Sequence, residues 1–533
     1  VGMNTRIFVF DLVTKKIINR FDEENYVLSS AQVSPDGTLT AIGTFTGVIN
    51  FYENTNFSKV LEIQTFIDKG PVWITSDNYY LSSKSSLKEL YFKYNNTLYP
   101  FDQFDINFNR PDKVLEKLGK IEPVLLAAYK EAWNKRFRKS GIPSNRLRPD
   151  FKVPEVKILN AQDIPAFTTN DPVIRMALEL SDGDADIVSY NIWVNGIPEY
   201  GTRWRKLKAI GKHVVINDSI RITGSNNIIQ VGCKNSYGVE SLREKFEVKN
   251  YVVDSIERKT YLYIVSVSNY SDARYNLKYA VKDGRDLAQA FKLRYKMNLI
   301  IDTLFNEKAT LQNILAWRKE LLKTNINDRV IIYVSGHGVL DKNFDFYYAT
   351  SEIDFRDPSL KGLAYEDIEK LLDSIPAREK LLLMDACHSG EVDKETVVNG
   401  TAIRPPIKTD PAVVVYKSKG LIVEQGKKRL GLSNSFELMQ DLFANLNSGN
   451  GTVVISAAAG NSYAYESDAW KNGVFTYSIL HGLVDKVADM DNDKRVSLSE
   501  IQRYVSSQVQ RLTKGAQKPT ARQENLENDW IIW

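Results

Sequence analysis

Cysteine is scarce in this sequence: Cys233 and Cys387 are the two cysteines among 533 residues. Two cysteines exclude the disulfide framework of a small secreted domain and the ligand set of a multi-cysteine zinc site. Apolar runs are also short, since none approaches the ~18 residues that a membrane-spanning helix needs. The first residues lack the charged and apolar regions of a signal segment. These absences predict a cytoplasmic protein without a membrane partner.

Neither sign of charge dominates the sequence. The sequence contains 70 Lys and Arg residues and 66 Asp and Glu residues, which gives a formal net charge of +4. A charge this small and this dispersed does not indicate nucleic acid or an anionic membrane as a partner. The length allows three or four domains. Because a strand-like stretch follows Val1 almost at once, we expect the sequence to be a piece of a longer protein.

Three similar β-rich stretches recur near the start of the chain. They are RIFVFDL (6–12), GVINFYE (47–53) and KELYFKY (88–94). Phe10 and Tyr52 are 42 residues apart, and Tyr52 and Phe92 are 40 apart. A period of about 40 to 45 residues is typical of WD-repeat propeller blades. We therefore predict partial propeller blades over 1–106, with a plain β-meander as the alternative because no Trp-Asp dipeptide is present.

Three further regions follow these repeats. Residues 107–152 have helical spacing and predict a helical connector. Residues 153–252 contain short strands separated by turns, which favour an immunoglobulin-like β-sandwich with Cys233 as a core residue. From 253 to 533, strands alternate with helices. This pattern predicts an α/β domain with a mainly parallel sheet covered by helices.

Two motifs in this last region carry the chemistry. VIIYVSGHG closes on Gly336, His337 and Gly338, and KLLLMDACHSGE contains Asp385 and Cys387. Each apolar run stops at a small-residue turn, as a buried parallel strand does at the edge of an α/β sheet. Sites in such sheets form at the carboxyl ends of strands. We therefore expect the imidazole of His337 and the thiol of Cys387 to meet.

The pair SGHG and DACHSG resembles the motifs of caspase-like cysteine peptidases, and especially the metacaspase and paracaspase branch. In caspases the catalytic His precedes the Cys by about 50 residues, and here 387 − 337 = 50. Cys387 would be the nucleophile and His337 the general base and later acid, without a metal ion or cofactor. The resemblance implies that the amides of Gly338 and Cys387 form the oxyanion hole. His388 and His481 are weaker candidates for the base.

The same resemblance predicts the substrate. Metacaspases and paracaspases carry an Asp two residues before the nucleophile, here Asp385, whereas caspases carry a neutral Gln. The segment NLKYAVKDGRDL resembles the one that supplies a second pocket acid, here Asp283. Two carboxylates attract a cation and repel a substrate Asp, so we expect a protein or peptide substrate with Arg or Lys before the cut. Three candidates for lining the cleft follow in a later loop: Tyr465, Glu466 and Trp470.

A long stretch without clear elements spans 391–432 and contains the basic run Lys427, Lys428 and Arg429. Such a length suggests an exposed functional loop. It occupies the position at which members of the family are cut into large and small parts. We therefore predict self-processing near this basic run.

A calcium loop is a further hypothesis for the acidic stretch near the C-terminus. Asp489, Asp491 and Asp493, with Glu500 in twelfth place, have the spacing of calcium ligands. Lys494 replaces the Gly that the sharp turn needs. A capping box from Ser497 to Glu500 explains the same residues equally well.

The leading interpretation is a caspase-like endopeptidase behind a WD-repeat segment and a β-sandwich. Two alternatives stay open: a legumain-like or clostripain-like peptidase, and a non-catalytic scaffold with an inert α/β domain. Bacterial proteins of this layout are associated with defence and regulated cell death. By that analogy alone, a gasdermin-like pore-forming protein is a candidate substrate.

Overall fold

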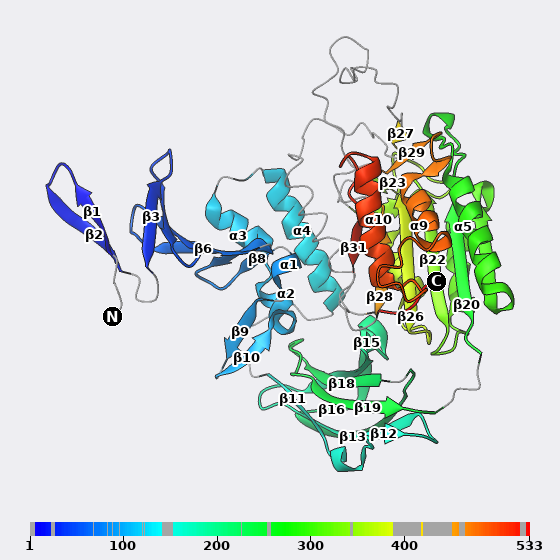
Figure 1. Ribbon diagram of the computed structural model, residues 1–533. Helices are drawn as coiled ribbons and strands as arrows, with labels where there is room; N and C mark the ends of the chain where they lie inside the picture. Colours follow the sequence, from blue (N-terminus) through cyan, green and yellow to red (C-terminus); the bar gives the residue numbers. More distant parts are fainter. Residues whose placement is uncertain are drawn as a thin grey trace, which may run out of the picture. The chain divides into compact units, whose positions relative to one another are not determined.

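The structure is a computed structural model, and Figure 1 shows its elements in sequence order. It describes residues 6–22, 27–67, 69–82, 84–87, 89–94, 96–119, 121, 123–140, 153–224, 226–252, 257–341, 345–386, 417–418, 450–457, 464–522 and 529–533. Packing divides the chain into two compact units. The first contains 1–155, 181–187 and 234–242, and the second contains 156–180, 188–233 and 243–533. Among the described helices, none is long and apolar enough to cross a membrane.

Antiparallel strands make up most of the N-terminal region. A hairpin of β1 (Arg6–Asp11) and β2 (Lys16–Asp22) comes first. One continuous sheet follows, with β3 (Leu28–Val33), β4 (Leu39–Thr44), β5 (Val48–Glu53), β6 (Lys59–Phe66), β7 (Lys69–Thr75) and β8 (Tyr80–Ser82) in that order. A second hairpin pairs β9 (Tyr91–Tyr94) with β10 (Thr97–Pro100). The three repeated stretches thus form β1, β5 and β9, each in a different sheet.

Two turns in the region of the predicted repeat, SPDG from Ser34 and TSDN from Thr75, have matching geometry. Gly37 and Asn78 occupy corresponding positions 41 residues apart, and both have positive φ, +71° and +64°. Each donates its N–H to the carbonyl three residues earlier, Ser34 in one turn and Thr75 in the other. Glycine and asparagine are the residues that adopt this left-handed conformation most readily. The geometry supports an internal repeat, while its identity as a WD repeat stays a prediction.

Helices lie on both sides of the second hairpin in the chain, the first before it and the others after it. They are α1 (Lys84–Leu87), α2 (Asp105–Phe108), α3 (Pro111–Leu118) and α4 (Pro123–Ser140). Pro111 occupies the first turn of α3, where its missing N–H costs nothing, and Gly119 ends the helix in the left-handed conformation. Helices therefore occupy the region predicted as a connector.

Two antiparallel-rich sheets form the predicted sandwich region. One contains β11 (Glu155–Ile158), β13 (Val173–Ser181) and β17 (His213–Arg221). The other contains β12 (Phe167–Thr168), β19 (Glu244–Asn250), β18 (Asn226–Asn235), β14 (Ile187–Val194) and β15 (Ile197–Pro198), with β16 (Arg205–Gly211) paired to β14. Cys233 is fully buried on β18, as expected of a core residue.

A six-stranded sheet forms the centre of the C-terminal region. Its order is β21 (Leu299–Phe305), β20 (Thr260–Ser266), β22 (Arg329–Gly336), β26 (Glu379–Ala386), β28 (Thr452–Ser456) and β31 (Thr520–Arg522). All neighbours are parallel except β28 and β31. The sequence order of β20, β21 and β22 differs from their spatial order, as crossover connections require. The mainly parallel sheet is confirmed.

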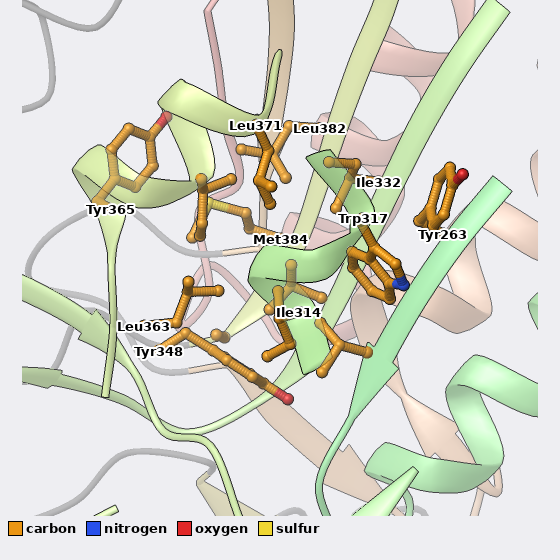
Figure 2. Close-up of a cluster of buried hydrophobic side chains, with 14 of the residues drawn as sticks. Tyr263, Ile314, Trp317, Ile332, Tyr348, Leu363, Tyr365, Leu371, Leu382 and Met384 are labelled. Atoms are coloured by element: carbon orange, nitrogen blue, oxygen red, sulfur yellow. The ribbon is translucent and has the colours of Figure 1, made fainter. Parts of the chain in front are cut away.

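Helices cover both faces of this sheet, which explains its continuous apolar strands. One face packs on α6 (Leu311–Leu321) and α7 (Tyr365–Leu372). The other packs on α5 (Ala280–Tyr295), α9 (Val474–Val484) and α10 (Leu498–Leu512). Neighbouring residues on a strand enter opposite layers. Figure 2 shows Ile332 and Met384 in the layer that contains Trp317, whereas Tyr333 lies in the other layer.

Two small sheets flank the central sheet. One contains β23 (Gly338–Leu340), β24 (Phe346–Tyr348) and β25 (Leu363–Ala364). The other contains β27 (Lys417–Ser418), β29 (Tyr465–Ser467) and β30 (Asn472–Gly473). The first small sheet begins directly after His337, and the second contains Glu466. Both residues belong to the predicted site.

The second unit also joins part of the sandwich to the base of the central sheet. Asp373, after α7, accepts hydrogen bonds from the backbone N–H and the hydroxyl of Thr202, both at 2.9 Å. Arg378 donates to Glu199 at 2.8 Å and to the Arg221 carbonyl at 2.7 Å. These contacts lie just before β26, at the end of that strand opposite Asp385.

Candidate active site

The two chemical motifs lie on neighbouring strands in matched register. Ser335 of β22 pairs with Asp385 of β26, and Gly336 pairs with Ala386. His337 follows Gly336 directly, and Cys387 follows Ala386 directly. Cys387 lies outside the described residues, as does His388. The structure therefore shows the strand ends that lead to the predicted pair, at one edge of the sheet.

His337 is buried, with 3% of its surface exposed, and its ring is held in a defined orientation. Its Nε2 atom lies 2.7 Å from the carbonyl oxygen of Tyr275. Because a carbonyl can only accept, Nε2 carries the hydrogen, and in the neutral ring Nδ1 carries the lone pair. The backbone N–H of His337 donates to the hydroxyl of Tyr270 at 3.0 Å, and the Tyr270 ring lies 5.2 Å from the imidazole. In this tautomer, Nδ1 is the ring atom that can accept a proton.

Gly336 is required by close packing before His337. A β-carbon at this position would lie 2.9 Å from the Tyr270 hydroxyl and 3.1 Å from a ring carbon of Tyr348. Tyr348 in turn donates its hydroxyl to the Ser335 carbonyl at 3.0 Å. Gly338 begins β23 and pairs with Tyr348. The glycines of this motif therefore allow two tyrosines to pack on the strand end.

The structure brings Asp283 and Asp385 together at the N-terminus of α9. Asp283 accepts hydrogen bonds at 3.0 Å from the Asn472 side chain and at 2.9 Å from the N–H of Gly473, the N-cap residue. Asp385 accepts one at 2.6 Å from the hydroxyl of Thr476, one helical turn later. Both carboxylates are fully buried. The positive end of a helix stabilises negative charge, so this turn accommodates two acids.

Tyr333 and Thr476 are site residues that our sequence analysis missed. The Tyr333 hydroxyl lies 2.5 Å from that of Thr476, and both residues are fully buried. Burial raises the pKa of Tyr333 well above its usual value, and the charges of Asp385 and Asp283 raise it further. Tyr333 was visible in the sequence as an aromatic in the strand before His337. No sequence signal indicated Thr476.

Glu466 connects the loop of β29 to the start of α5. Its two carboxylate oxygens accept from the backbone N–H groups of Lys278 and Tyr279, at 2.9 and 3.1 Å. It is buried, and it lies at the same helix end as Asp283. Tyr465 and Trp470 pack against the hydrophobic layer beneath. Substrate contact by Glu466 stays a prediction, and its observed contacts are with the backbone.

His481 lies on α9 between two tyrosines. Its ring stacks with those of Tyr477 and Tyr504, and its Nδ1 atom lies 2.5 Å from the Tyr504 hydroxyl. These contacts place the His481 ring within an aromatic stack between α9 and α10.

Of the stretch 391–432, the structure describes residues 417–418. They form β27, which pairs antiparallel with β29, Lys417 opposite Glu466 and Ser418 opposite Tyr465. The candidate cut residues Lys427, Lys428 and Arg429 lie outside the described part of the chain.

The acidic loop before α10 has features of a calcium site and of a helix cap. Carboxylate oxygens of Asp489, Asp491 and Asp493 lie within 4.8 Å of one another, and such oxygens suit calcium. Lys494 adopts φ +70°, so it makes the turn for which a glycine is usual. Glu500, however, forms the capping box of α10 with Ser497, and its oxygens accept three backbone N–H groups. The three aspartates therefore fit the ion better than Glu500 does.

Similarity to known proteins was found for the C-terminal half of the chain. The sequence model of the caspase-domain family matches residues 259–530, slightly more than half of the chain. Among solved structures, this chain is similar to caspase-1 from Spodoptera frugiperda, with 10% identity and a TM-score of 0.30. The alignment covers 50% of this chain and 89% of that one. No match was found among curated proteins. The chain belongs to the caspase-domain family of cysteine peptidases.

Proposed function

We propose that this protein is a cysteine endopeptidase that cleaves protein substrates after Arg or Lys. Cys387 is the nucleophile and His337 the general base. The observation that carries the proposal is the gathering of Asp283 and Asp385 at one helix end, with Asp385 two residues before Cys387 in the sequence.

In the proposed mechanism, His337 first accepts the proton of the Cys387 thiol and later donates it to the leaving amine. Nδ1 of His337 takes the thiol proton, and the thiolate attacks the carbonyl carbon of the substrate. N–H groups of Gly338 and Cys387 stabilise the oxyanion. The imidazolium then gives its proton to the leaving amine, and water hydrolyses the thioester. The Tyr275 carbonyl, which accepts from Nε2, supports the charged imidazole during these steps.

Charge determines the substrate preference. A guanidinium or ammonium group entering beside Asp283 and Asp385 is attracted by two carboxylates in an environment that excludes water. A substrate aspartate would bring a third negative charge into the same space. Discrimination between these side chains is therefore large, because the wrong one is repelled as well as unpaired.

Matched peptides test this proposal. Peptides that differ in one residue before a fluorophore, Arg, Lys, citrulline or Asp, are incubated with the wild type. We expect cleavage of the Arg or Lys peptide, little cleavage of the citrulline peptide, and none after Asp. Cys387→Ala and iodoacetamide should each abolish activity, whereas Cys233→Ala, the matched control at a buried cysteine, should retain it.

Other results would favour the alternatives. Preference for Asp would refute the basic specificity. Cleavage after other residues at the same thiol would favour a legumain-like or clostripain-like peptidase. No cleavage of any peptide or proteome digest would favour a non-catalytic scaffold.

Self-processing is part of the same proposal. A basic run at Lys427, Lys428 and Arg429 supplies the residue type that the site prefers. Incubated wild type should divide into two fragments, and Cys387→Ala should remain one band. The triple change Lys427→Ala, Lys428→Ala and Arg429→Ala should also remain one band while still cleaving peptides. If wild type and Cys387→Ala give the same band pattern, self-processing is wrong.

A further inference from the structure

A chain of buried hydroxyl groups ends on one of the pocket acids. The Thr476 hydroxyl donates to Asp385 at 2.6 Å, and it lies 2.5 Å from the Tyr333 hydroxyl. A threonine hydroxyl has one hydrogen, which here goes to the carboxylate. Tyr333 must therefore donate to Thr476, so both hydrogens point toward Asp385.

Three elements contribute one residue each to this chain. Tyr333 lies on β22, Thr476 on the first turn of α9, and Asp385 on β26. All three side chains are completely buried. Because rotation of any of them would break a hydrogen bond away from water, the direction of the chain is fixed.

The surrounding charges explain why a carboxylate here needs such support. Asp283 lies at the same helix end, and two carboxylates at one helix end repel each other. Asp286 and Lys282 on α5 pair with each other and contact Asn472, which also donates to Asp283. On the strand side, the titratable neighbour shown by the described residues is Tyr333. Hydroxyl donors offset the repulsion without adding a cation that would compete with the substrate.

We propose that Tyr333 and Thr476 are positioning residues that orient the Asp385 carboxylate toward the substrate, and so set the preference for a basic residue over a neutral one of equal shape. The inference rests on the proposed function and deepens it. The effect of Tyr333 and Thr476 reaches the substrate through Asp385.

A change at Thr476 separates this role from simple packing. Thr476→Val keeps the shape but removes the hydroxyl from the middle of the chain. A hydrogen bond to a charged group is worth roughly a 10- to 100-fold change in equilibrium. We expect kcat/KM for an Arg peptide to fall by about 10-fold or more, chiefly through KM. The citrulline peptide, which offers no charge to Asp385, should change little.

The experiment measures the Arg-to-citrulline ratio of kcat/KM in four proteins: wild type, Thr476→Val, Thr476→Ser and Tyr333→Phe. Thr476→Ser keeps the donor and should retain the wild-type ratio. Tyr333→Phe keeps the Thr476 donor and should lower the ratio by a smaller factor than Thr476→Val. Thermal unfolding of each protein shows whether it is folded, and the serine and phenylalanine variants still decide the matter if Thr476→Val does not fold.

Two results would overturn the inference in different ways. If Thr476→Val lowers kcat/KM for both peptides by the same factor, Tyr333 and Thr476 act only through packing. The same conclusion follows if Thr476→Ser lowers the Arg-to-citrulline ratio as much as Thr476→Val does. If the wild type itself does not prefer Arg over citrulline, the proposed specificity fails and this inference fails with it.

Discussion

Lys380 provides a stability prediction with a defined sign. This lysine begins the buried part of β26 and has 2% of its surface exposed. Its Nζ atom lies 3.4 Å from the Leu372 carbonyl, a long hydrogen bond. Burial lowers its pKa to about 8, while nearby Asp373 acts in the opposite direction. The folded protein therefore carries a charged group in an environment that disfavours the charge.

The energy follows from the difference in pKa. A decrease from 10.5 to about 8 corresponds to about 3 kcal/mol, since each pKa unit is worth about 1.4 kcal/mol. The charged form is the penalised one, so the penalty is fully present below about pH 8. It disappears as pH rises toward 10.5, where the unfolded chain also loses the proton. Lys380→Met removes the penalty at the loss of about 1 kcal/mol for the hydrogen bond. At pH 7 we expect a net stabilisation of about 2 kcal/mol.

The assay compares free energies of unfolding of wild type and Lys380→Met in denaturant between about pH 7 and pH 10. Other groups that titrate in this range are common to both proteins, so their difference isolates Lys380. The advantage of the variant should shrink as pH rises. Lys370→Met, at an exposed lysine on α7, is the matched control and should show no pH-dependent difference. A variant that is less stable at pH 7, or a difference that stays constant with pH, would refute the reasoning.

Three further predictions concern the site and the acidic loop. Gly336→Ala should destabilise the protein by about 1 to 3 kcal/mol and reduce peptide cleavage, because the new β-carbon would lie 2.9 Å from the Tyr270 hydroxyl. Adding Tyr270→Phe removes that hydroxyl and should restore part of the lost melting temperature. Glu466→Gln should cost about 1 to 3 kcal/mol and lower cleavage of Arg and citrulline peptides equally, whereas a selective loss of the Arg peptide would favour direct substrate contact. If the aspartate cluster binds calcium, millimolar calcium should raise the melting temperature of wild type but not of Asp491→Asn, and an unchanged wild type would contradict this.

The central sheet was predictable because its strands are buried on both faces. Runs such as Val330 to Val334 and Leu381 to Met384 are continuously apolar, and each ends at a chemically distinctive turn. Parallel strands place such ends at one edge, so the adjacency of β22 and β26 followed from pattern alone. The family resemblance added Asp283, which no periodicity would have connected to Asp385.

The contacts between these parts were not predictable from the sequence. Tyr275 orients His337 through a backbone carbonyl, and every residue type has that group. Asn472 lies on β30 and Thr476 on α9, both far from Asp283 and Asp385 in the chain, and ordinary polar residues carry no signal of their partner. The sequence indicated the loop that contains Glu466 as part of the site. It did not indicate that Glu466 accepts from the backbone N–H groups of Lys278 and Tyr279 before α5.

β26 is held by side-chain contacts at both of its ends. Seven of its eight residues, Lys380 to Ala386, are buried, and β22 and β28 pair with it on either side. Before its first residue, Arg378 is fixed by Glu199 of the sandwich. At its other end, Asp385 is fixed by the first turn of α9. A strand held along both edges and at both ends cannot shift without breaking buried hydrogen bonds. The position of Asp385 is therefore set by the whole sheet.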